Sequence, residues 1–414
     1  MNRRVVVTGT GVISPVGNDT QTFWKNILDG VCGIDFITSI PTDDLPVRIA
    51  GEVKDFTPAD YGIETPFARK QDKFTLYAVA AAWQAMNESG LSSAENGNID
   101  PFRLGVYVGS GIGGFTTQVR ETEKLIKDGP KWVSPLFIPT MIANIAAGNI
   151  AIRHKACGPC LPVVTACATS THALGEAYRA IKHGYADAII TGGTEAAVIP
   201  RGIAGFANAK ALSRAEDPKY ASLPFSADRG GFVMAEGAAM LVLEEYEHAV
   251  ARGANIIAEV CGYGNTCDAH HVTAPRPDGK TQSAAIKMAL EEAGYTSDDV
   301  LYINAHGTGT ALNDASETAA FKLALGEDAY KAHISSTKGA IGHMLGAAGA
   351  IEAIASVLAL RDGVVPPTIN LTNPDPELDL DYTPNTAVKA DLTIAVSDSL
   401  GFGGHNGAVA FRKY

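Results

Sequence analysis

The amino-acid sequence predicts an α/β protein made of two related halves. Short runs of β-branched residues alternate with helical patterns along the chain, as they do where helices cover a sheet on both faces. The 43 glycines gather at the ends of these runs, which indicates tight turns between strands and helices. A chain of 414 residues is also longer than one simple core requires, which favours two domains or a duplicated fold.

The individual elements follow from this alternation. The expected strands are Arg4–Val7, Gly105–Val108, Leu161–Thr165, Ala188–Thr191, Met240–Leu243, Ile256–Val260, Leu301–Asn304, His333–Ser336, Thr393–Ser397 and Ala408–Phe411. The expected helices include Lys73–Asn87, Thr171–His183, Gln282–Ala293 and Ala347–Arg361. Strands that alternate with helices in this way are expected to be buried on both faces.

The two halves of the chain repeat each other in two places. Cys167 is followed nine residues later by Glu-Ala in "HALGEAYRAIKHG", and His343 is followed at the same spacing by Glu-Ala in "GAAGAIEAIASVLALRDG". "LGVYVGSGIGG" and "VLYINAHGTGT" both describe a strand that runs into a glycine-rich loop. We therefore predict an internal duplication with a boundary near Gly253, which gives domains 1–252 and 253–414. Equivalent loops of the two halves would face each other across a shared site.

Composition and charge limit the classes of function. Hydrophobic residues make up 46% of the chain and charged residues 19%, as in ordinary soluble globular proteins. A net charge of −12 argues against nucleic acid as a bulk electrostatic partner. No apolar run reaches the ~18–20 residues of a membrane span, and glycine and proline interrupt the first apolar stretch before it has signal-peptide length. We expect a cytoplasmic protein, whose six unevenly spaced cysteines do not suggest a disulfide framework.

Cys167 lies in "VVTACATST", where a β-branched run gives way to a helical pattern. A buried cysteine is usually a small, inert hydrophobe, and that interpretation stays open on position alone. A thiol at the start of a helix, however, faces unpaired backbone N–H groups and the positive end of the helix dipole. Both favour the thiolate, so we expect the pKa of Cys167 to lie below its free value of about 8.5. Small neighbours, Ala166, Ala168 and Ser170, leave room for a substrate at the sulfur.

Two histidines of the second half strengthen the case for a reactive cysteine. His306 lies in "NAHGTGT", just after a predicted strand, and His343 lies in "STKGAIGHMLGAAGA", in a glycine-rich turn before a helix. A single histidine in a loop is usually solvated or structural. Two of them at such turns, in the half opposite the cysteine, indicate acyl-transfer chemistry, in which the sulfur attacks and the imidazoles handle protons and charge.

Three further motifs carry weaker signals. "CGPC" at Cys157–Cys160 has the spacing of a redox dithiol, but it follows a helical stretch instead of opening a helix, and no second cysteine pair supports a zinc site. "GSGIGG" at Gly109–Gly114 matches a dinucleotide-binding fingerprint, but no acidic residue closes a second strand at the required spacing. "CDAHH" at Cys267–His271 is more readily a polar loop beside a cleft than a metal site.

Together, "TACATS" with Cys167, "NAHGTGT" with His306, "STKGAIGHMLGAAGA" with Lys338 and His343, and "SLGFGGHNGAV" at Ser399–Val409 resemble the elongating β-ketoacyl-acyl-carrier-protein synthases, most closely those of type II. The resemblance runs from "VVVTGTGVISPVGN" to the last predicted strand, and its motifs are specific in type and in order. It implies the thiolase-like fold, with two duplicated halves in five α-β-α-β-α layers. It also implies a condensing enzyme of fatty acid biosynthesis.

The resemblance assigns roles to the reactive residues. Cys167 would be the acylated nucleophile, while His306 and His343 would hold the malonyl thioester carbonyl and promote loss of CO2. Lys338, supported by Glu352, would keep the charge and the hydrogen bonds of the site in order.

The resemblance also implies the surroundings of the reacting atoms. The backbone N–H groups of Cys167 and Phe402 would form an oxyanion hole, and Phe402 would act as a gate on a glycine-rich loop. The remaining implied residues are Ile112, Phe137 and Phe206 in an acyl pocket, Thr308 and Thr310 at the carrier's pantetheine arm, and Arg69, Lys70, Lys131 and Lys210 at a carrier-docking surface.

The implied partners are acyl- and malonyl-loaded acyl carrier protein and a second copy of the chain in a homodimer, with no nucleic acid and no membrane. The implied chemistry needs no nucleotide, flavin or metal. Two positions depart from the family pattern. Family members usually carry aspartate in the stretch "DRGGF", where Gly231 would remove its hydrogen bond, and they usually carry serine where this chain has Gly339.

Two alternatives stay open besides the redox interpretation of the cysteine pair. "HGTGTALND" also occurs in ketosynthases of type II polyketide and polyene pathways, which share the chemistry. A non-catalytic chain-length-factor-like subunit shares the fold but lacks the nucleophile, so the presence of Cys167 with both histidines counts against it.

Overall fold

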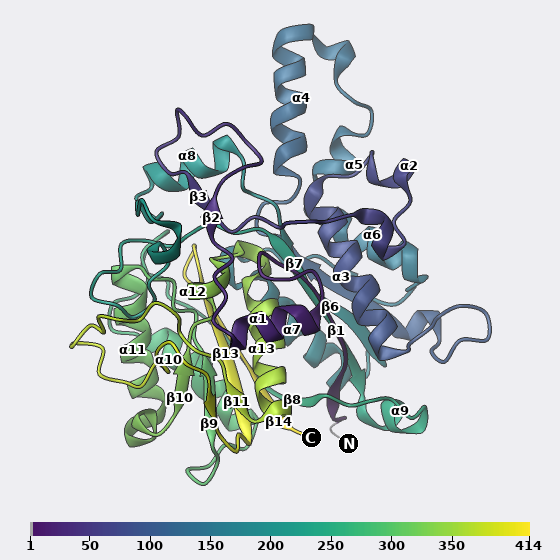
Figure 1. Ribbon diagram of the computed structural model, residues 1–414. Helices are drawn as coiled ribbons and strands as arrows, with labels where there is room; N and C mark the ends of the chain where they lie inside the picture. Colours follow the sequence, from purple (N-terminus) through teal and green to yellow (C-terminus); the bar gives the residue numbers. More distant parts are fainter. Residues whose placement is uncertain (1–2) are drawn as a thin grey trace.

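A mixed sheet of ten strands dominates the computed structural model, which describes residues 3–414 (Figure 1). The strands are β1 (Val5–Ile13), β4 (Leu104–Gly109), β5 (Cys160–Leu161), β6 (Ala188–Glu195), β7 (Gly237–Glu245), β8 (Ala258–Cys267), β9 (Leu301–Asn304), β10 (His333–Ser335), β13 (Ile394–Gly401) and β14 (His405–Lys413). Two short pairs lie outside it, β2 (Asp35–Phe36) with β3 (Ile49–Ala50) and β11 (Val364–Val365) with β12 (Val388–Lys389).

The helices alternate with these strands. They are α1 (Thr20–Leu28), α2 (Thr65–Ala68), α3 (Lys73–Ser89), α4 (Phe115–Asp128), α5 (Phe137–Met141), α6 (Ile145–His154), α7 (Thr169–Lys182), α8 (Pro200–Asn208), α9 (Tyr246–Ala251), α10 (Lys280–Glu292), α11 (Ala311–Leu325), α12 (Lys338–Ile341) and α13 (Ala348–Asp362). Two one-turn 3₁₀ helices, Ala166–Ala168 and Leu345–Ala347, lead directly into α7 and α13.

The strand order shows the internal duplication. It runs β10-β9-β13-β14-β8-β1-β7-β6-β4-β5, and the two halves join where β1 and β8 pair antiparallel in the middle. Outward from this junction, each half has two antiparallel pairings followed by two parallel ones. The loop that follows β4 therefore has its counterpart in the loop that follows β9, as the matching motifs predicted. Gly253 lies in the connection between α9 and β8, and a domain boundary there stays a prediction.

The helices complete five layers, which follow one another from left to right in Figure 1. α7 and α13 pack against each other in the middle, and each also contacts strands of both halves. α3 covers β1, β7 and β6 on one outside face, while α10 covers β8, β14 and β13 on the other, with α11 against α10. The predicted α-β-α-β-α arrangement is confirmed, with the addition that the two sheets are continuous through β1 and β8.

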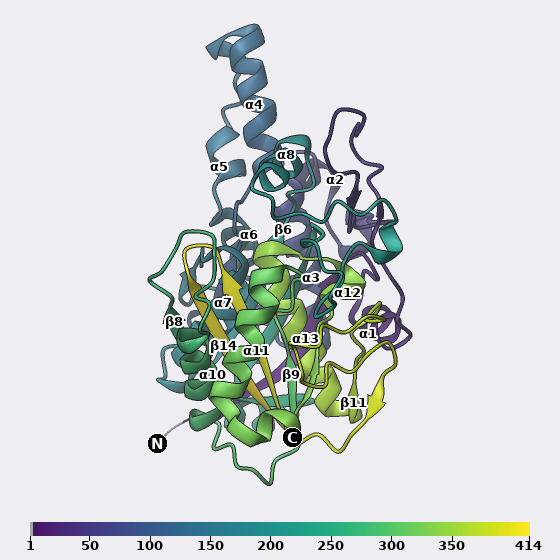
Figure 2. The ribbon, with the colours of Figure 1, turned by 90° about the vertical axis from the view of Figure 1, so that its left-hand side faces the viewer.

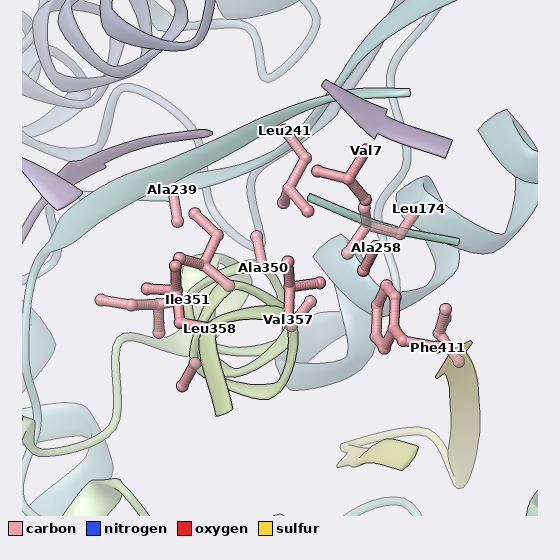
Figure 3. Packing of buried hydrophobic residues seen from close by; sticks show 14 of the residues in the cluster. Val7, Leu174, Ala239, Leu241, Ala258, Ala350, Ile351, Val357, Leu358 and Phe411 are labelled. Carbon is pink, nitrogen blue, oxygen red and sulfur yellow. The ribbon is translucent and has the colours of Figure 1, made fainter. Parts of the chain in front are cut away.

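The central helix α13 is buried around its whole circumference from Ala348 to Leu360, and only Glu352 and Ser356 are polar in that stretch, as expected for a helix enclosed by protein on all sides. Its side chains, among them Ile351 and Leu358, pack toward β7 at Ala239 and Leu241 (Figure 3). Gly349 lies so close to α7 that an added Cβ would stand 1.9 Å from Thr171 Oγ1. The small residues of the two helices thus allow the close contact that brings the two halves together.

Nine of the ten expected strands coincide with observed strands to within three residues at their starts, and the four expected helices are all present. The exception is Leu161–Thr165, which was expected to form a buried strand before Cys167. Only Cys160–Leu161 pairs, with β4 alone, and both residues are exposed. Val163–Thr165 continue as irregular chain, with Val164 54% exposed. β5 is an edge strand, and one side of it has no neighbouring strand among residues 3–414.

The segment from α4 to α5 projects from the top of the molecule in both views (Figures 1 and 2). Large apolar side chains are exposed along it: Leu125, Ile126, Trp132, Leu136 and Ile138. Monomeric proteins rarely expose an apolar group of this size without a partner for it. Among residues 3–414, no helix combines the length and the apolar character needed to cross a bilayer.

Candidate active site

Cys167 stands on a strained turn at the start of α7. The residue before it, Ala166, has φ of 51°, in the left-handed region that residues with a side chain rarely adopt. The turn places Cys167 at the N-terminus of α7. Only 9% of the surface of Cys167 is exposed. Gly401 of β13 approaches so closely that an added Cβ would lie 3.2 Å from Cys167 N. The strain therefore persists because both helix and sheet hold the turn.

Cys167, His306 and His343 line one cavity of about 410 Å³. The centroids of the two imidazole rings lie 5.2 Å apart, with the ring planes at 87°. His306 comes from the loop after β9, and His343 from the turn that follows α12. The nucleophile candidate of the first half and both imidazoles of the second half thus meet in one chamber, as the sequence predicted.

Backbone hydrogen bonds hold the two histidines in place. The amide of His343 donates to the carbonyl of Val233 at 2.7 Å, and its own carbonyl accepts from Ala235 N at 2.8 Å. Next to His306, the amide of Gly307 donates to Glu317 Oε2 at 2.8 Å. The buried segment 233–235 therefore holds the backbone of His343, and the buried Glu317 of helix α11 holds the backbone next to His306.

Both imidazoles are neutral. Burial lowers the pKa of His306 and of His343 well below the usual value, and the nearby positive charge of Lys338 lowers both further. A neutral imidazole carries one N–H donor and one acceptor nitrogen. Each ring can therefore donate a hydrogen bond to a substrate oxygen or accept a proton.

Lys338 fixes which nitrogen of His306 carries the proton. Its Nζ lies 3.3 Å from His306 Nδ1 and also pairs with Glu352 Oε1, and all three residues are buried. An ammonium group only donates, so His306 Nδ1 is the acceptor and the proton of the ring sits on Nε2. Burial raises the pKa of Glu352 to about 7, against the opposing effect of the Lys338 charge. The ion pair thus prepares His306 as a donor through Nε2.

The expectation of a lowered thiol pKa is wrong for this structure. Burial raises the pKa of Cys167 to about 12, while the Lys338 charge and the backbone N–H of Phe402 act in the opposite direction. The carboxylates of Glu195 and Glu352 raise it as well. The helix start is present as predicted, but removal of water from the sulfur outweighs it. Cys167 rests as the neutral thiol, and its proton must leave as the sulfur attacks.

The raised pKa predicts how Cys167 reacts with an alkylating reagent. Only the thiolate reacts, so its rate with iodoacetamide should rise about tenfold for each pH unit from 7 to 9. Peptide mass spectrometry of samples quenched at several times measures this rate at Cys167 separately from the other cysteines, and the Cys167→Ser variant supplies the background. A rate that levels off by pH 8 would contradict a raised pKa.

Phe402 lies at the mouth of the cavity, directly after β13. The next two residues are glycines with φ of 90° and 78°, a backbone that side chains would resist. A row of rings continues inward, with centroids 6.2 Å apart from Phe402 to Phe206, 5.6 Å from Phe206 to Phe232 and 5.1 Å from Phe232 to His343. The row of rings thus links Phe402 to the imidazole of His343, which lines the same cavity.

Comparison with known families agrees with this geometry. Residues 2–249 match the family described as "Beta-ketoacyl synthase, N-terminal domain", and residues 257–372 match "Beta-ketoacyl synthase, C-terminal domain". The chain belongs to the beta-ketoacyl synthase family. The resemblance inferred from the motifs around Cys167, His306 and His343 is thereby confirmed.

Individual beta-ketoacyl synthases are similar over the full length. The chain is 49% identical over 413 residues to "3-oxoacyl-[acyl-carrier-protein] synthase 2" of Staphylococcus aureus (strain COL), covering 100% of this chain and 99% of the relative. The protein of the same name from Synechocystis sp. is also 49% identical over 413 residues, covering 100% and 98%. Among solved structures, "The ishigamide ketosynthase/chain length factor" superposes with a TM-score of 0.92 at 35% identity and full coverage of both chains.

Several other residues expected from the synthase resemblance also line the cavity. Thr308 and Thr310 do so with their hydroxyl oxygens 3.0 Å apart, and Lys210 lies at the same cavity. Ile112 and Phe137 do not: Ile112 is 37% exposed on the loop after β4, and Phe137 is half-buried at the start of α5. Phe206, whose ring lies near that of Phe402, does not line the cavity either. An acyl pocket formed by Ile112, Phe137 and Phe206 stays a prediction. The remaining docking candidates, Arg69, Lys70 and Lys131, are exposed outside the cavity.

The sequence did not single out some residues of the synthase cavity. Asp268 lines it and holds the glycine-rich loop after β13, since its Oδ1 accepts from Asn406 Nδ2 at 2.8 Å and its amide donates to Gly404 O at 2.8 Å. Its motif "CDAHH" was expected to be a polar loop beside a cleft, and Asp268 occupies that place. Arg229, held by Asp375 at 2.6 Å, and Phe232 line the cavity too, without any local signal for that role.

Two sequence interpretations need correction in this synthase, while the departure at Gly339 stays a prediction. Gly231 has φ of 135°, and an added Cβ would lie 2.5 Å from Leu212 C, so an aspartate does not fit at this position. At Gly230 no atom lies within 4 Å of an added Cβ, so the aspartate of other family members fits there instead. At Gly339 an added Cβ would lie 3.1 Å from Ile369 O, a tight fit for serine. The first repeat is also shifted: the one-turn helices align Cys167 with Gly346, not with His343.

The weaker motifs lie away from the reacting groups. Cys157 lies in the connection between α6 and β5, and Cys160 is the first residue of β5; both are free and exposed, and neither opens a helix. Oxidation of this pair stays the untested alternative that the sequence left open. In "GSGIGG", the amides of Gly111 and Ile112 donate to Glu195 at 2.9 and 3.3 Å. A carboxylate of the protein itself thus occupies donors that a phosphate would need.

Proposed function

We propose that this chain condenses an acyl group with a malonyl group, both carried as thioesters by acyl carrier protein, to give a 3-oxoacyl thioester two carbons longer and CO2. The observation that carries the proposal is the single cavity in which Cys167 meets two neutral imidazoles. Relatives named 3-oxoacyl-[acyl-carrier-protein] synthase 2 at 49% identity support fatty acid synthesis as the pathway.

In the first half-reaction Cys167 takes over the acyl group. Its sulfur attacks the thioester carbonyl, a neutral imidazole accepts the thiol proton, and the pantetheine sulfur leaves and takes a proton up. The negative charge of the tetrahedral intermediate falls near the backbone amides of Cys167 and Phe402. The Phe402 amide already faces the sulfur closely enough to lower the pKa of Cys167.

In the second half-reaction the malonyl thioester loses CO2. The electron pair of the broken C–C bond forms an enolate, whose oxygen accepts hydrogen bonds from the imidazoles, including His306 through Nε2. The enolate carbon attacks the Cys167 thioester and forms the new C–C bond. The Cys167 sulfur leaves as thiolate and regains a proton. The irreversible loss of CO2 drives the step.

The direct test supplies decanoyl-carrier and malonyl-carrier to the purified protein. We expect 3-oxododecanoyl-carrier and one equivalent of CO2, followed by mass spectrometry and by release of labelled CO2. Decanoyl-carrier alone should acylate the protein once. Acylation without elongation would instead favour a different acyltransferase, and neither event would fit a non-catalytic chain-length-factor-like subunit. Elongation with a polyketide carrier but not with a fatty acid carrier would assign the protein to a polyketide pathway.

Docking of the carrier is proposed to use Arg69, Lys70, Lys131 and Lys210, of which Lys210 lies at the cavity. An acidic carrier needs a local basic surface because the chain carries a net charge of −12. The double variant Arg69→Gln/Lys210→Gln should raise KM for carrier-bound substrates about fivefold and leave kcat with small pantetheine thioesters unchanged. Steady-state kinetics with both substrate types measures this.

The control for docking is Lys331→Gln/Lys389→Gln, which removes two exposed lysines that do not line the cavity. It removes the same charge from the chain. If it raised KM as much as the first pair, net charge and not a docking surface would be responsible. An equal effect of the first pair on small thioesters would place its residues in substrate binding instead.

A homodimer is proposed from two exposed features of one half. The edge strand β5 has one unpaired side, and the segment from α4 to α5 exposes an apolar group. An open strand edge and a group of exposed apolar side chains each suit contact with a second copy. Light scattering after size exclusion should give twice the chain mass, and Leu161→Lys at the edge should shift it toward one chain mass. The expected cytoplasmic location stays a prediction.

A further inference from the structure

His172 is a buried imidazole that the proposed chemistry does not use. It lies near the start of α7, five residues after Cys167, and only 3% of its surface is exposed. Its Nδ1 lies 2.7 Å from Thr165 Oγ1, and its Nε2 lies 3.3 Å from Asn406 O. Both ring nitrogens therefore have a partner, one in the first half of the chain and one in the second.

The two contacts of His172 fix the direction of both hydrogen bonds. The carbonyl oxygen of Asn406 can only accept, so His172 Nε2 carries the ring proton and donates it. Nδ1 is then the acceptor, and the Thr165 hydroxyl donates to it. Burial lowers the pKa of His172 to about 4, so the ring is neutral near pH 7 and keeps this arrangement. A continuous chain of hydrogen bonds thus runs from Thr165 through the imidazole to Asn406.

The Thr165 end of this chain of hydrogen bonds belongs to the nucleophile turn. Thr165 stands two residues before Cys167, and its carbonyl accepts from Ala168 N at 3.1 Å, which closes the turn. The Thr165 amide donates to Thr169 Oγ1 at 2.9 Å. With its hydroxyl on His172, every polar group of Thr165 is bound. A shift of His172 would therefore move the turn that carries the Cys167 amide.

The Asn406 end belongs to the hairpin that carries Phe402. Asn406 of β14 pairs with Leu400 of β13. The turn between the two strands is closed by Gly404 N, which donates to Gly401 O at 3.1 Å. Phe402 lies within this short turn, two residues after Leu400. The position of β14 at Asn406 therefore determines where the Phe402 amide lies.

We propose that His172 is a positioning residue that sets the distance between the two amides of the oxyanion hole. One amide belongs to Cys167, on the turn that Thr165 closes, and the other belongs to Phe402, in the hairpin of Asn406. His172 does not line the cavity, so it acts through the two segments that it joins. The proposal rests on the proposed function, since an oxyanion forms only when Cys167 attacks a thioester.

The test breaks the link at one end at a time. In His172→Asn, the shorter side chain can still accept from the Thr165 hydroxyl but no longer reaches Asn406 O. In His172→Gln, the NH2 group can still donate to Asn406 O, but the Thr165 hydroxyl loses its acceptor. Both variants should slow the saturated rate of Cys167 acylation by decanoyl-carrier about ten- to a hundredfold, with KM changed little. Intact mass measures this rate.

Alkylation by iodoacetamide separates a positioning role of His172 from a structural one. The reagent reacts with the same sulfur but forms no oxyanion, so its rate at Cys167 should change by less than about threefold in both variants. If alkylation and acylation slowed by the same factor, His172 would merely keep the nucleophile turn folded, and the proposal would be overturned. Acylation at the wild-type rate in either variant would overturn it too, because one bond to the ring would then suffice.

The matched control is His154→Asn. Burial lowers the pKa of His154 to about 4 as well, but this residue ends α6 and does not line the cavity. This control should acylate at the wild-type rate. If neither variant of His172 folds, Thr165→Val decides, since it removes only the hydroxyl that donates to the ring and should slow acylation but not alkylation. If wild-type Cys167 takes up no acyl group, the proposed function fails, whereas normal acylation in the wild type and in the His172 variants refutes the role of His172 alone.

Discussion

Replacement of Cys167 by serine is expected to abolish elongation, with a loss of at least about 10³-fold in kcat, while the fold is retained. Serine is close in size to cysteine, and the buried turn that holds residue 167 can accommodate it without a cavity. Its hydroxyl is a far weaker nucleophile than sulfur, and the ester it forms would transfer the acyl group poorly to an enolate. The loss should therefore appear in both half-reactions.

Intact mass after incubation with acyl-carrier measures the first half-reaction directly. The wild-type protein should gain one acyl group, located on the peptide that contains Cys167, and the Cys167→Ser variant should gain none. The matched control is Cys261→Ser. Cys261 is a second thiol whose pKa burial raises to about 12, and its sulfur lies 3.5 Å from Ala410 O, outside the cavity.

The control variant should acylate and elongate at the wild-type rate. A stable thioester in the Cys167→Ser variant, on Cys157 or any other cysteine, would refute the assignment of the nucleophile. That result would also revive the redox-active or otherwise reactive cysteine pair as the centre of the chemistry. Full activity with serine at position 167 would refute it equally.

The reactive residues were predictable because their signals are local. Cys167, His306 and His343 each stand where a predicted strand or glycine-rich turn meets a helix, and such junctions are visible in the order of residue types. The match between the motifs after β4 and β9 predicted the duplication, and the thiolase-like fold is confirmed. The loop after β9 lines the cavity, whereas the loop after β4 does not, so only one of the two equivalent loops takes the place that the sequence predicted.

Properties that depend on distant neighbours were not predictable. The pKa of Cys167 is raised instead of lowered, because the effect of burial outweighs that of the helix start. The negative charges of Glu195 and Glu352, which lie elsewhere in the sequence, raise it as well. Leu161–Thr165 has the composition of a central strand, but only the arrangement of the whole sheet shows that β5 is an edge. Backbone conformation was equally hidden, since the shared left-handed φ of Ala166 and Leu345, not the shared Glu-Ala pair, sets the register of the repeat.

Glu352→Leu is expected to destabilise the protein by about 3–5 kcal/mol, because it leaves the Lys338 ammonium buried without its carboxylate. Lys338 is only 1% exposed, and its other contact in the site is His306, whose pKa burial and that same charge already lower. Lys338→Met should lower the free energy of unfolding by less than Glu352→Leu does. It leaves Glu352 alone, but the raised pKa of that carboxyl lets it take up a proton and become neutral.

The double variant Lys338→Met/Glu352→Leu removes both charges and should recover most of the stability lost by Glu352→Leu, since apolar side chains of similar size replace the pair. Urea unfolding of the four proteins measures the coupling between the two positions. The double variant should nonetheless fail to decarboxylate malonyl-carrier, because nothing then holds the His306 proton on Nε2. Cys167 should still accept an acyl group from acyl-carrier, since that step does not require His306 as a donor.

Measuring stability and decarboxylation separately distinguishes a catalytic role of the Lys338–Glu352 pair from a role in the packing of the core. A double variant as unstable as Glu352→Leu would show that packing around Lys338, not its charge, keeps the site folded. A stable double variant that decarboxylates malonyl-carrier at the wild-type rate would show that His306 adopts its reactive tautomer unaided. The ion pair costs free energy to bury, and we expect it to be retained because the ammonium at His306 Nδ1 keeps the donor at Nε2.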